Sequence, residues 1–261
     1  MPRARPLPSS LGDSFTFAEG TAAGATPKQL RRAEFAAPFR AARMRPSPDE
    51  DEKADQDEDP FRDPLVDIVR SLSTAYALVM PPDAHLSHST AAAHHGLPLP
   101  RHAFALHEDP LLAISDRVFV EAAVHGPGRA PRGGRIRGHE TVAAQDPVMR
   151  VAGIPMSTPA ATWGSLAARL SIEELVSVGD AAVQVPRIPG PFGRVLRAPL
   201  ATFEDLDAVI PCGAPRRDRE APRGPHADPG RIRLAEGDGT AAGADERHRP
   251  SGPRPGPRRV R

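Results

Sequence analysis

The stretch that decides the fold of the amino-terminal part of the chain is residues 14–32, SFTFAEGTAAGATPKQLRR. A short helix is expected over residues 18–23, because Ser14 and Thr16 offer capping hydroxyls before it and Gly24 can end it. Thr26 then supplies an N-cap and Pro27 the first position of a second helix, which is expected to continue to about residue 35. Two short helices joined by a glycine-containing turn predict a helix-turn-helix.

The residues that follow extend this module and make it basic. Residues 38–45, PFRAARMR, alternate well enough to form a strand or wing, so residues 7–46 are predicted to be a winged helix-turn-helix. A recognition helix needs exposed Arg, Lys, Gln or Asn side chains to reach base edges, with neighbouring cations on the phosphates. The predicted DNA contacts are Lys28, Gln29, Arg31, Arg32, Arg40 and Arg43. The alternative is a small helical hairpin with a solvated basic face.

A different composition begins after this module. Residues 47–64 are acidic and contain prolines but almost no apolar side chains, which predicts a solvated linker. Residues 65–210 alternate helical and extended patterns, which predicts a mixed α+β middle domain. Helices are expected from 65 to the Pro81–Pro82 stop, from Ser87 or Ser89 to His95, from Thr158 to Leu170, from Ser171 to about Val185, and around 202–206. Strands are expected over 118–124 and 148–154, with the Arg- and Gly-rich residues 127–138 between them.

Residues 211–261 differ from everything before them. They contain no Phe, Trp, Tyr or Lys, and a segment with so few apolar groups cannot offset the entropy cost of ordering. A disordered tail is therefore expected. Its Arg, Pro, Gly and Ala content is what GC-rich codons give in any frame, and we hypothesise that it is an out-of-frame translation.

Composition excludes several classes of protein. The single cysteine, Cys212, rules out a disulfide or cysteine-based zinc framework within the chain. No apolar run approaches the roughly 18 residues that a membrane span needs. A soluble, cytoplasmic protein is expected. The net charge is +1 because a basic amino-terminal block and an acidic linker nearly cancel.

Two groups of polar residues are candidates for sites of chemistry. His85, His88, His94 and His95 have spacings found in zinc sites, but no cysteine is near them and Asp83 is the closest carboxylate, so no metal ligand is predicted. The pair His139–Glu140 follows Arg135 and Arg137, which is more typical of a basic strand edge than of acid–base catalysis. Residues 127–138 could instead touch nucleic acid or an acidic partner. Neither catalytic residues nor a cofactor are expected, and the protein is not expected to be an enzyme.

Together, several segments resemble a family of bacterial proteins related to the abortive-infection (AbiEi) antitoxins of type IV toxin-antitoxin systems. The matching segments are 15–19 (FTFAE), 27–32 (PKQLRR), 86–100 (LSHSTAAAHHGLPLP), 151–163 (VAGIPMSTPAATW), 166–170 (LAARL) and 178–180 (VGD). The resemblance covers roughly residues 7–210 and implies an amino-terminal winged helix that binds double-stranded DNA, often the promoter of its own operon.

Longer members of that family look as though they end in a domain similar to very-short-patch-repair endonucleases. Such a domain would have to begin near Pro211, where it is missing or out of frame, since no lysine follows Lys53. The expected function is a DNA-binding, antitoxin-like transcriptional regulator. The alternatives are a truncated, inactive remnant of an endonuclease protein and an interaction protein whose middle domain binds a toxin.

Overall fold

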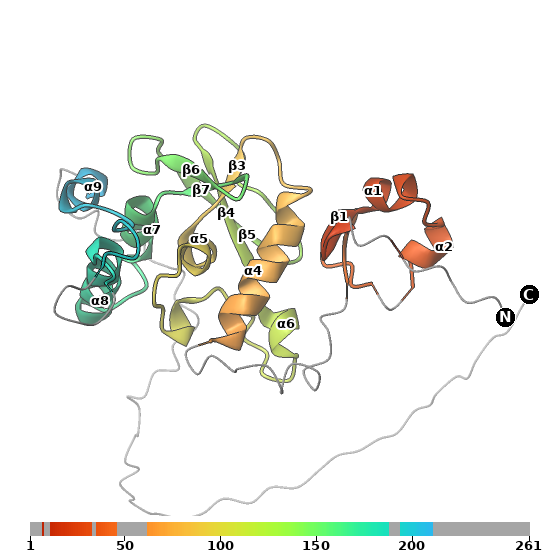
Figure 1. The fold of residues 1–261 in the computed structure, drawn as a ribbon, viewed down its shortest axis with the longest axis horizontal. Helices are drawn as coiled ribbons and strands as arrows, with labels where there is room; N and C mark the ends of the chain where they lie inside the picture. Colours follow the sequence, from red (N-terminus) through yellow and green to blue (C-terminus); the bar gives the residue numbers. More distant parts are fainter. Residues whose placement is uncertain (1–6, 8–10, 33–34, 46–61, 188–193, 211–261) are drawn as a thin grey trace, which may run out of the picture. The chain divides into compact units, whose positions relative to one another are not determined.

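The chain has a mixed α+β fold, shown as a computed structural model in Figure 1, which confirms the α+β part of the predicted fold class. The structure describes residue 7 and residues 11–32, 35–45, 62–187 and 194–210. Most of the predicted acidic linker and all of the predicted tail lie outside these residues.

The amino-terminal module contains one pair of strands and two short helices. Strand β1 (Ser14–Thr16) pairs antiparallel with β2 (Ala42–Met44), and helices α1 (Phe17–Ala22) and α2 (Pro27–Leu30) lie between them in sequence. Phe15, Ala25 and Leu30 form its buried apolar cluster. Gly20 allows α1 to pack closely here, because a Cβ on it would lie 2.9 Å from a methyl group of Leu30.

The second helix is shorter than the sequence pattern predicted. It ends at Leu30 rather than near residue 35, and Arg31 follows it as the C-cap. Both predicted helix starts are confirmed, since Thr16 and Thr26 each form a capping box with the residue three positions on. Among the residues of the module that the structure describes, two short helices and a strand pair are present, and a complete winged helix-turn-helix is not shown.

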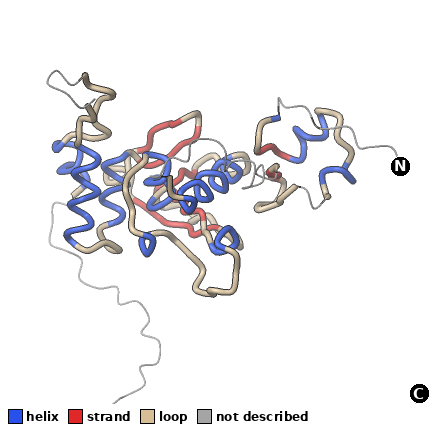
Figure 2. Tube along the Cα trace, turned by 60° about the horizontal axis from the view of Figure 1, so that its bottom comes forward, coloured by secondary structure: helices blue, strands red, loops and turns tan. Residues whose placement is uncertain are grey.

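The middle part of the chain is organised around a five-stranded sheet with the order β5-β4-β3-β7-β6. Its strands are β3 (Ala84–Leu86), β4 (Val120–His125), β5 (Ile136–Thr141), β6 (Val148–Val151) and β7 (Ile154–Ser157). The central strand β3 runs antiparallel to β4 and parallel to β7, while β4 and β5 are parallel and β6 and β7 are antiparallel. Figure 2 shows these strands, in red, gathered beside the helices.

Helices cover this sheet and pack on one another. They are α4 (Pro64–Ala77), α5 (His88–His95), α6 (Ile114–Arg117), α7 (Pro159–Leu166), α8 (Ile172–Val183) and α9 (Phe203–Val209), with a 3₁₀ turn η2 (Arg101–Ala103). The alanines of α5 are buried on both sides: Ala91 and Ala93 belong to the cluster shared with α4 and the sheet, and Ala92 to the cluster shared with α7, α8 and α9. Small side chains let neighbouring helices approach α5 from two directions.

Apolar contacts also join the first cluster to the amino-terminal module. Phe39 and Ala42 are buried in the same cluster as the α4 residues, and the rings of Phe39 and Tyr76 lie 5.2 Å apart. The helix expected to begin at residue 65 begins at Pro64, with Asp63 as its N-cap.

Two sequence predictions in the middle part were wrong in their extent. Residues 148–154 form not one strand but the start of the hairpin β6–β7, because Ala152 and Gly153 have φ of +49° and +83° and turn the chain. The helix expected to reach Leu170 ends at Leu166. Strand β3 was not predicted, since three residues are too few to show a period.

Candidate functional site

The predicted DNA contacts divide into exposed cations and side chains with structural roles. Lys28, Arg31, Arg32 and Arg40 are all exposed. Gln29 is engaged in capping, because its side-chain oxygen accepts hydrogen bonds from the Thr26 amide and hydroxyl, both at 2.9 Å. A glutamine held in this way has less freedom to reach a base edge.

Arg43 is partly buried and has a structural role within the module. Its Nε donates to the Leu30 carbonyl at 2.8 Å and its Nη1 donates to the Ala42 carbonyl at 2.7 Å. These bonds tie strand β2 to the carboxyl end of α2 and satisfy a carbonyl that a helix end leaves without an intrahelical partner. Arg43 therefore positions the neighbouring cations.

Stacking on an aromatic ring orients a second arginine. The guanidinium carbons of Arg31 and Arg43 lie 5.9 Å and 5.4 Å from the centre of the Phe17 ring, within the range of a cation–π contact. Holding Arg31 in this way lowers the entropy it would lose on contacting a ligand. We refer to the four exposed cations of the module, Lys28, Arg31, Arg32 and Arg40, as its basic surface, and among them Arg31 is held against the Phe17 ring.

The histidines singled out in the sequence do not form one site. His94 makes a hydrogen bond with the Ser73 hydroxyl at 2.7 Å, and Nε2 of His95 donates to the Ser157 carbonyl at 2.8 Å. His85 and His88 instead lie close to residues that are distant in the sequence. Each belongs to a separate cluster of three residues whose ligand atoms lie within 4.8 Å of one another.

Glu121 is the centre of the first cluster, with His88 and His139. This fully buried carboxylate accepts hydrogen bonds from the Ser89 amide at 3.0 Å and hydroxyl at 2.6 Å, which places it at the first turn of α5. It also pairs with Arg169 and lies 3.0 Å from Nε2 of His139. Burial by itself would raise the pKa of Glu121, but the hydrogen bonds from His139 and Arg169 outweigh it and hold the pKa well below its usual value.

His88 shows local strain beside this carboxylate. Its φ of +49° lies in the left-handed region, and its ring stacks on that of His139 with centres 3.8 Å apart. Burial, followed by the nearby His139, lowers the pKa of His88 to about 4. Two imidazoles stacked so closely are best accommodated when at least one is neutral.

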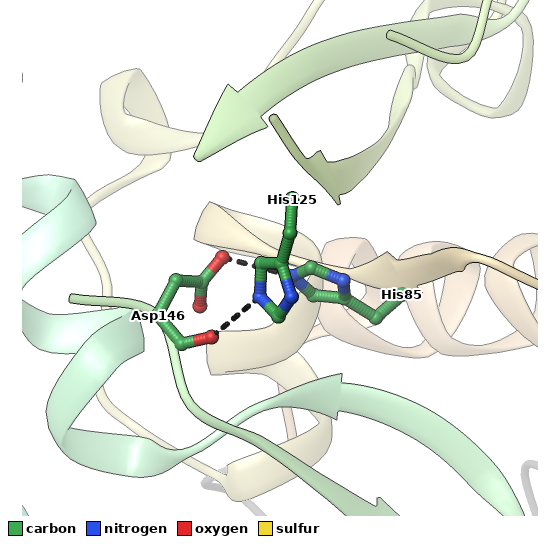
Figure 3. Close-up of side chains that lie close together, drawn as sticks. All are labelled: His85, His125 and Asp146. Carbon is green, nitrogen blue, oxygen red and sulfur yellow. Dashed lines mark hydrogen bonds and ion pairs between the residues drawn. The ribbon is translucent and has the colours of Figure 1, made fainter. Parts of the chain in front are cut away.

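The second cluster consists of His85, His125 and Asp146 (Figure 3). His85 and Asp146 are buried, with Nε2 and Oδ2 2.8 Å apart, and Nε2 of His125 donates to the backbone carbonyl of Asp146, also at 2.8 Å. Burial would raise the pKa of Asp146, but hydrogen bonds, chiefly from His85, keep it below its ordinary value. An open pocket of about 360 Å³ adjoins the cluster and is lined by both histidines.

Sequence reasoning missed Glu121, His125 and Asp146. Glu121 did leave a signal, since it interrupts the apolar run VFVEAAV of residues 118–124, and a carboxylate in a buried strand must be paired. His125 and Asp146 left none, because their neighbours are ordinary loop and strand-end residues. They are brought together only by the pairing of β3 with β4 and by the loop before β6.

The basic segment before β5 has mostly local roles. Arg135 donates to the Ser115 carbonyl and lies 3.7 Å from Asp116, while Arg137 stacks on Phe119 with 5.5 Å between guanidinium and ring centre. Glu140 is exposed, whereas His139 beside it turns toward Glu121. The structure therefore separates the residues of the pair His139–Glu140.

Within the described part of the chain, every helix is too short or too polar to cross a lipid bilayer. No protein-family model matches the sequence. No curated protein matches it significantly either.

Proposed function

We propose that the chain is a DNA-binding, antitoxin-like transcriptional regulator whose basic amino-terminal module contacts the duplex. The observation that carries the proposal is the exposure of Lys28, Arg31 and Arg32 on α2 and the turn that follows it. Over residues 11–45 the sequence holds six Lys and Arg against three Asp and Glu, a balance that favours an anionic ligand.

The internal contacts of the module support the same proposal. Arg43 holds strand β2 against the end of α2, and the Phe17 ring orients Arg31. The exposed cations therefore lie on a segment that is held by contacts with the rest of the module. Rigid placement of cations favours recognition of a regular array of phosphates. The motif resemblance to AbiEi-type antitoxins points in the same direction, with Arg40 as a further phosphate contact.

Duplex binding by charge-matched variants tests the proposal. The affinity of the full chain for the DNA upstream of its own gene, and for a random duplex, is measured by fluorescence anisotropy. The triple variant Lys28→Ala, Arg31→Ala, Arg32→Ala is expected to bind at least about tenfold more weakly, since each lost phosphate contact removes counterion release. The control variant Arg129→Ala, Arg132→Ala, Arg137→Ala loses the same charge from the middle part and is expected to bind like the parent. Equal affinities of the parent and the first variant would contradict the proposal, and a larger loss in the control would move the interface to residues 127–138.

A second candidate is binding of a toxin protein by the middle part of the chain. Ile172 and Val176 lie one turn apart on α8 with 78% and 55% of their surface exposed, which leaves a short apolar stripe facing solvent. Co-purification with the product of a neighbouring gene tests this candidate. The variant Ile172→Glu, Val176→Glu is expected to lose such a partner while keeping its affinity for DNA.

The third candidate is an inactive remnant of an endonuclease protein. Only a remnant that had kept activity would cleave duplex DNA in the presence of Mg²⁺ and stop when a chelator is added. We expect no such cleavage.

A further inference from the structure

We propose that His85, His125 and Asp146 bind a divalent transition-metal ion of the zinc class, with one coordination position facing the adjoining pocket. Two imidazoles and one carboxylate are a donor set that zinc and its neighbours in the first transition row prefer. The ligand atoms of the three residues already lie within 4.8 Å of one another. This site is separate from the basic amino-terminal surface, so it goes beyond the proposed function and either can hold without the other.

The positions of the three residues suit a site that is formed before the ion arrives. His85 lies on the central strand β3, and His125 ends the neighbouring strand β4, whose pairing with β3 fixes their separation. Asp146 comes from the loop just before β6, and its carbonyl accepts the hydrogen bond from His125. Ligands held by strands and by mutual hydrogen bonds lose little entropy on binding a metal.

The hydrogen bonds within the cluster leave each of the three residues an atom that can coordinate the ion. The contact between His85 Nε2 and Asp146 Oδ2, at 2.8 Å, joins two atoms that can each give a lone pair to a metal once the shared proton leaves. For neutral His85 this needs only the other tautomer, with the proton on Nδ1. On His125, Nε2–H is already bonded to the Asp146 carbonyl, so Nδ1 can act as the ligand. An imidazole whose second nitrogen donates to a backbone carbonyl is a common outer-shell arrangement in metal sites.

The surroundings leave room for a fourth ligand. His85 and His125 line an open pocket of about 360 Å³, together with Asp83, Met149 and Arg150. Three protein ligands with one position open to solvent are typical of zinc sites that hold a water molecule or a small anion. Arg150, which also lines the pocket, would favour an anion.

The neighbouring cluster of His88, Glu121 and His139 does not offer an equal site. Both oxygens of Glu121 accept hydrogen bonds from the Arg169 guanidinium, and one of them also accepts from Ser89. A metal ion there would have to displace these donors and lie beside a permanent positive charge. This difference provides a matched control within the same domain.

Metal binding by the full-length chain tests the proposal. After dialysis against a chelator, Zn²⁺ affinity is measured by competition with a chromophoric indicator, and Co²⁺ is added as a spectroscopic probe of coordination. The parent is expected to bind one equivalent, to show visible Co²⁺ bands and to melt at a higher temperature with Zn²⁺ than without it. His125→Ala is expected to bind Zn²⁺ at least about 100-fold more weakly, because it removes a ligand outright.

One further variant makes the result decisive. His139→Ala, in the neighbouring cluster, is expected to keep the affinity and the Co²⁺ spectrum of the parent. His125 is only half-buried, which makes its substitution a better test of the site than a substitution of the buried Asp146. The proposal is overturned if the parent binds no Zn²⁺, if His125→Ala retains the parent's affinity, or if His139→Ala loses as much affinity as His125→Ala.

Discussion

The guanidinium of Arg169 binds both carboxylate oxygens of the buried Glu121, with Nη1 2.9 Å from Oε2 and Nη2 2.6 Å from Oε1. Arg169 follows α7, Glu121 lies on β4, and Glu121 also caps the first turn of α5 through Ser89. The ion pair, together with the hydrogen bond from Ser89 to Glu121, therefore links the segment after α7, strand β4 and helix α5. A buried pair is costly to form but far more costly to break on one side.

Removing only the arginine should destabilise the fold strongly. Arg169→Ala is expected to lower the free energy of unfolding by about 3–5 kcal/mol, because it leaves the Glu121 charge buried without its partner. The double variant Glu121→Leu, Arg169→Met should recover much of that loss. Urea unfolding followed by circular dichroism measures both, with the exposed Arg101→Ala as control. A loss below about 1 kcal/mol for Arg169→Ala would show that the pair contributes no more than a surface salt bridge.

The lowered histidine pKa values predict how stability depends on pH. The pKa values of His88 and His94 are lowered to about 4, in both cases first by burial, and for His94 then by Arg70 and His95. The folded chain thus keeps both rings neutral while the unfolded chain takes up protons near pH 6.5, so stability is lost as the pH falls from about 6.5 to about 4. Glu121, with its lowered pKa, adds to the loss only at more acid pH.

A single substitution can isolate one of these contributions. His94→Gln is expected to reduce the drop in unfolding free energy between pH 7 and pH 5 by about 1–2 kcal/mol. The same pH dependence in parent and His94→Gln would contradict burial of a neutral ring at His94.

Ala41 is held in a conformation that favours glycine. Its φ is +70°, and its carbonyl accepts the hydrogen bond from the Phe17 amide, at 2.7 Å, at the start of α1. Ala41→Gly is expected to raise the free energy of unfolding by about 0.5–1 kcal/mol, since relief of the left-handed strain exceeds the added entropy of the unfolded chain. Ala37→Gly, where φ is not positive, should lower it instead. Thermal unfolding distinguishes these opposite signs, and destabilisation by both substitutions would refute the strain.

The acidic segment should weaken DNA binding by charge alone. Residues 49–59 contain eight Asp and Glu and one Lys, and they follow the basic module directly in the sequence. Deleting them is expected to tighten duplex binding, most at low salt, where charges are least screened. Replacing them by a Gly/Ser linker of equal length separates the effect of charge from that of length. No gain in affinity at low salt from either change would exclude competition by this segment.

Local signals in the sequence predicted the starts of several helices well. The caps at Thr16, Thr26, Thr158 and Ser171 are confirmed, because each depends on residues only three positions apart. The end of α5 at Gly96 is confirmed for the same reason. The predicted cap at Ser87 is only partly right: it is the N-cap residue, but Glu121, from a distant strand, provides the hydrogen bonds.

The polar clusters could not be predicted in this way. His85, His125 and Asp146 are separated by 40 and 21 residues, and only the order of strands in the sheet brings them together. The early end of α2 was missed because the periodic pattern continues through Arg31 and Arg32, whereas Arg43 binds the carbonyl at the helix end from another element.

The salt dependence of duplex affinity tests the central claim most directly. For the parent, the logarithm of the association constant should fall linearly with the logarithm of salt concentration, and each of Lys28→Ala, Arg31→Ala and Arg32→Ala that removes a phosphate contact should reduce the slope by about one unit. A variant that loses a base contact should instead keep its slope and lose sequence preference. If the triple variant binds operator and random duplex as the parent does across the whole titration, the amino-terminal module does not bind DNA and the claim is contradicted.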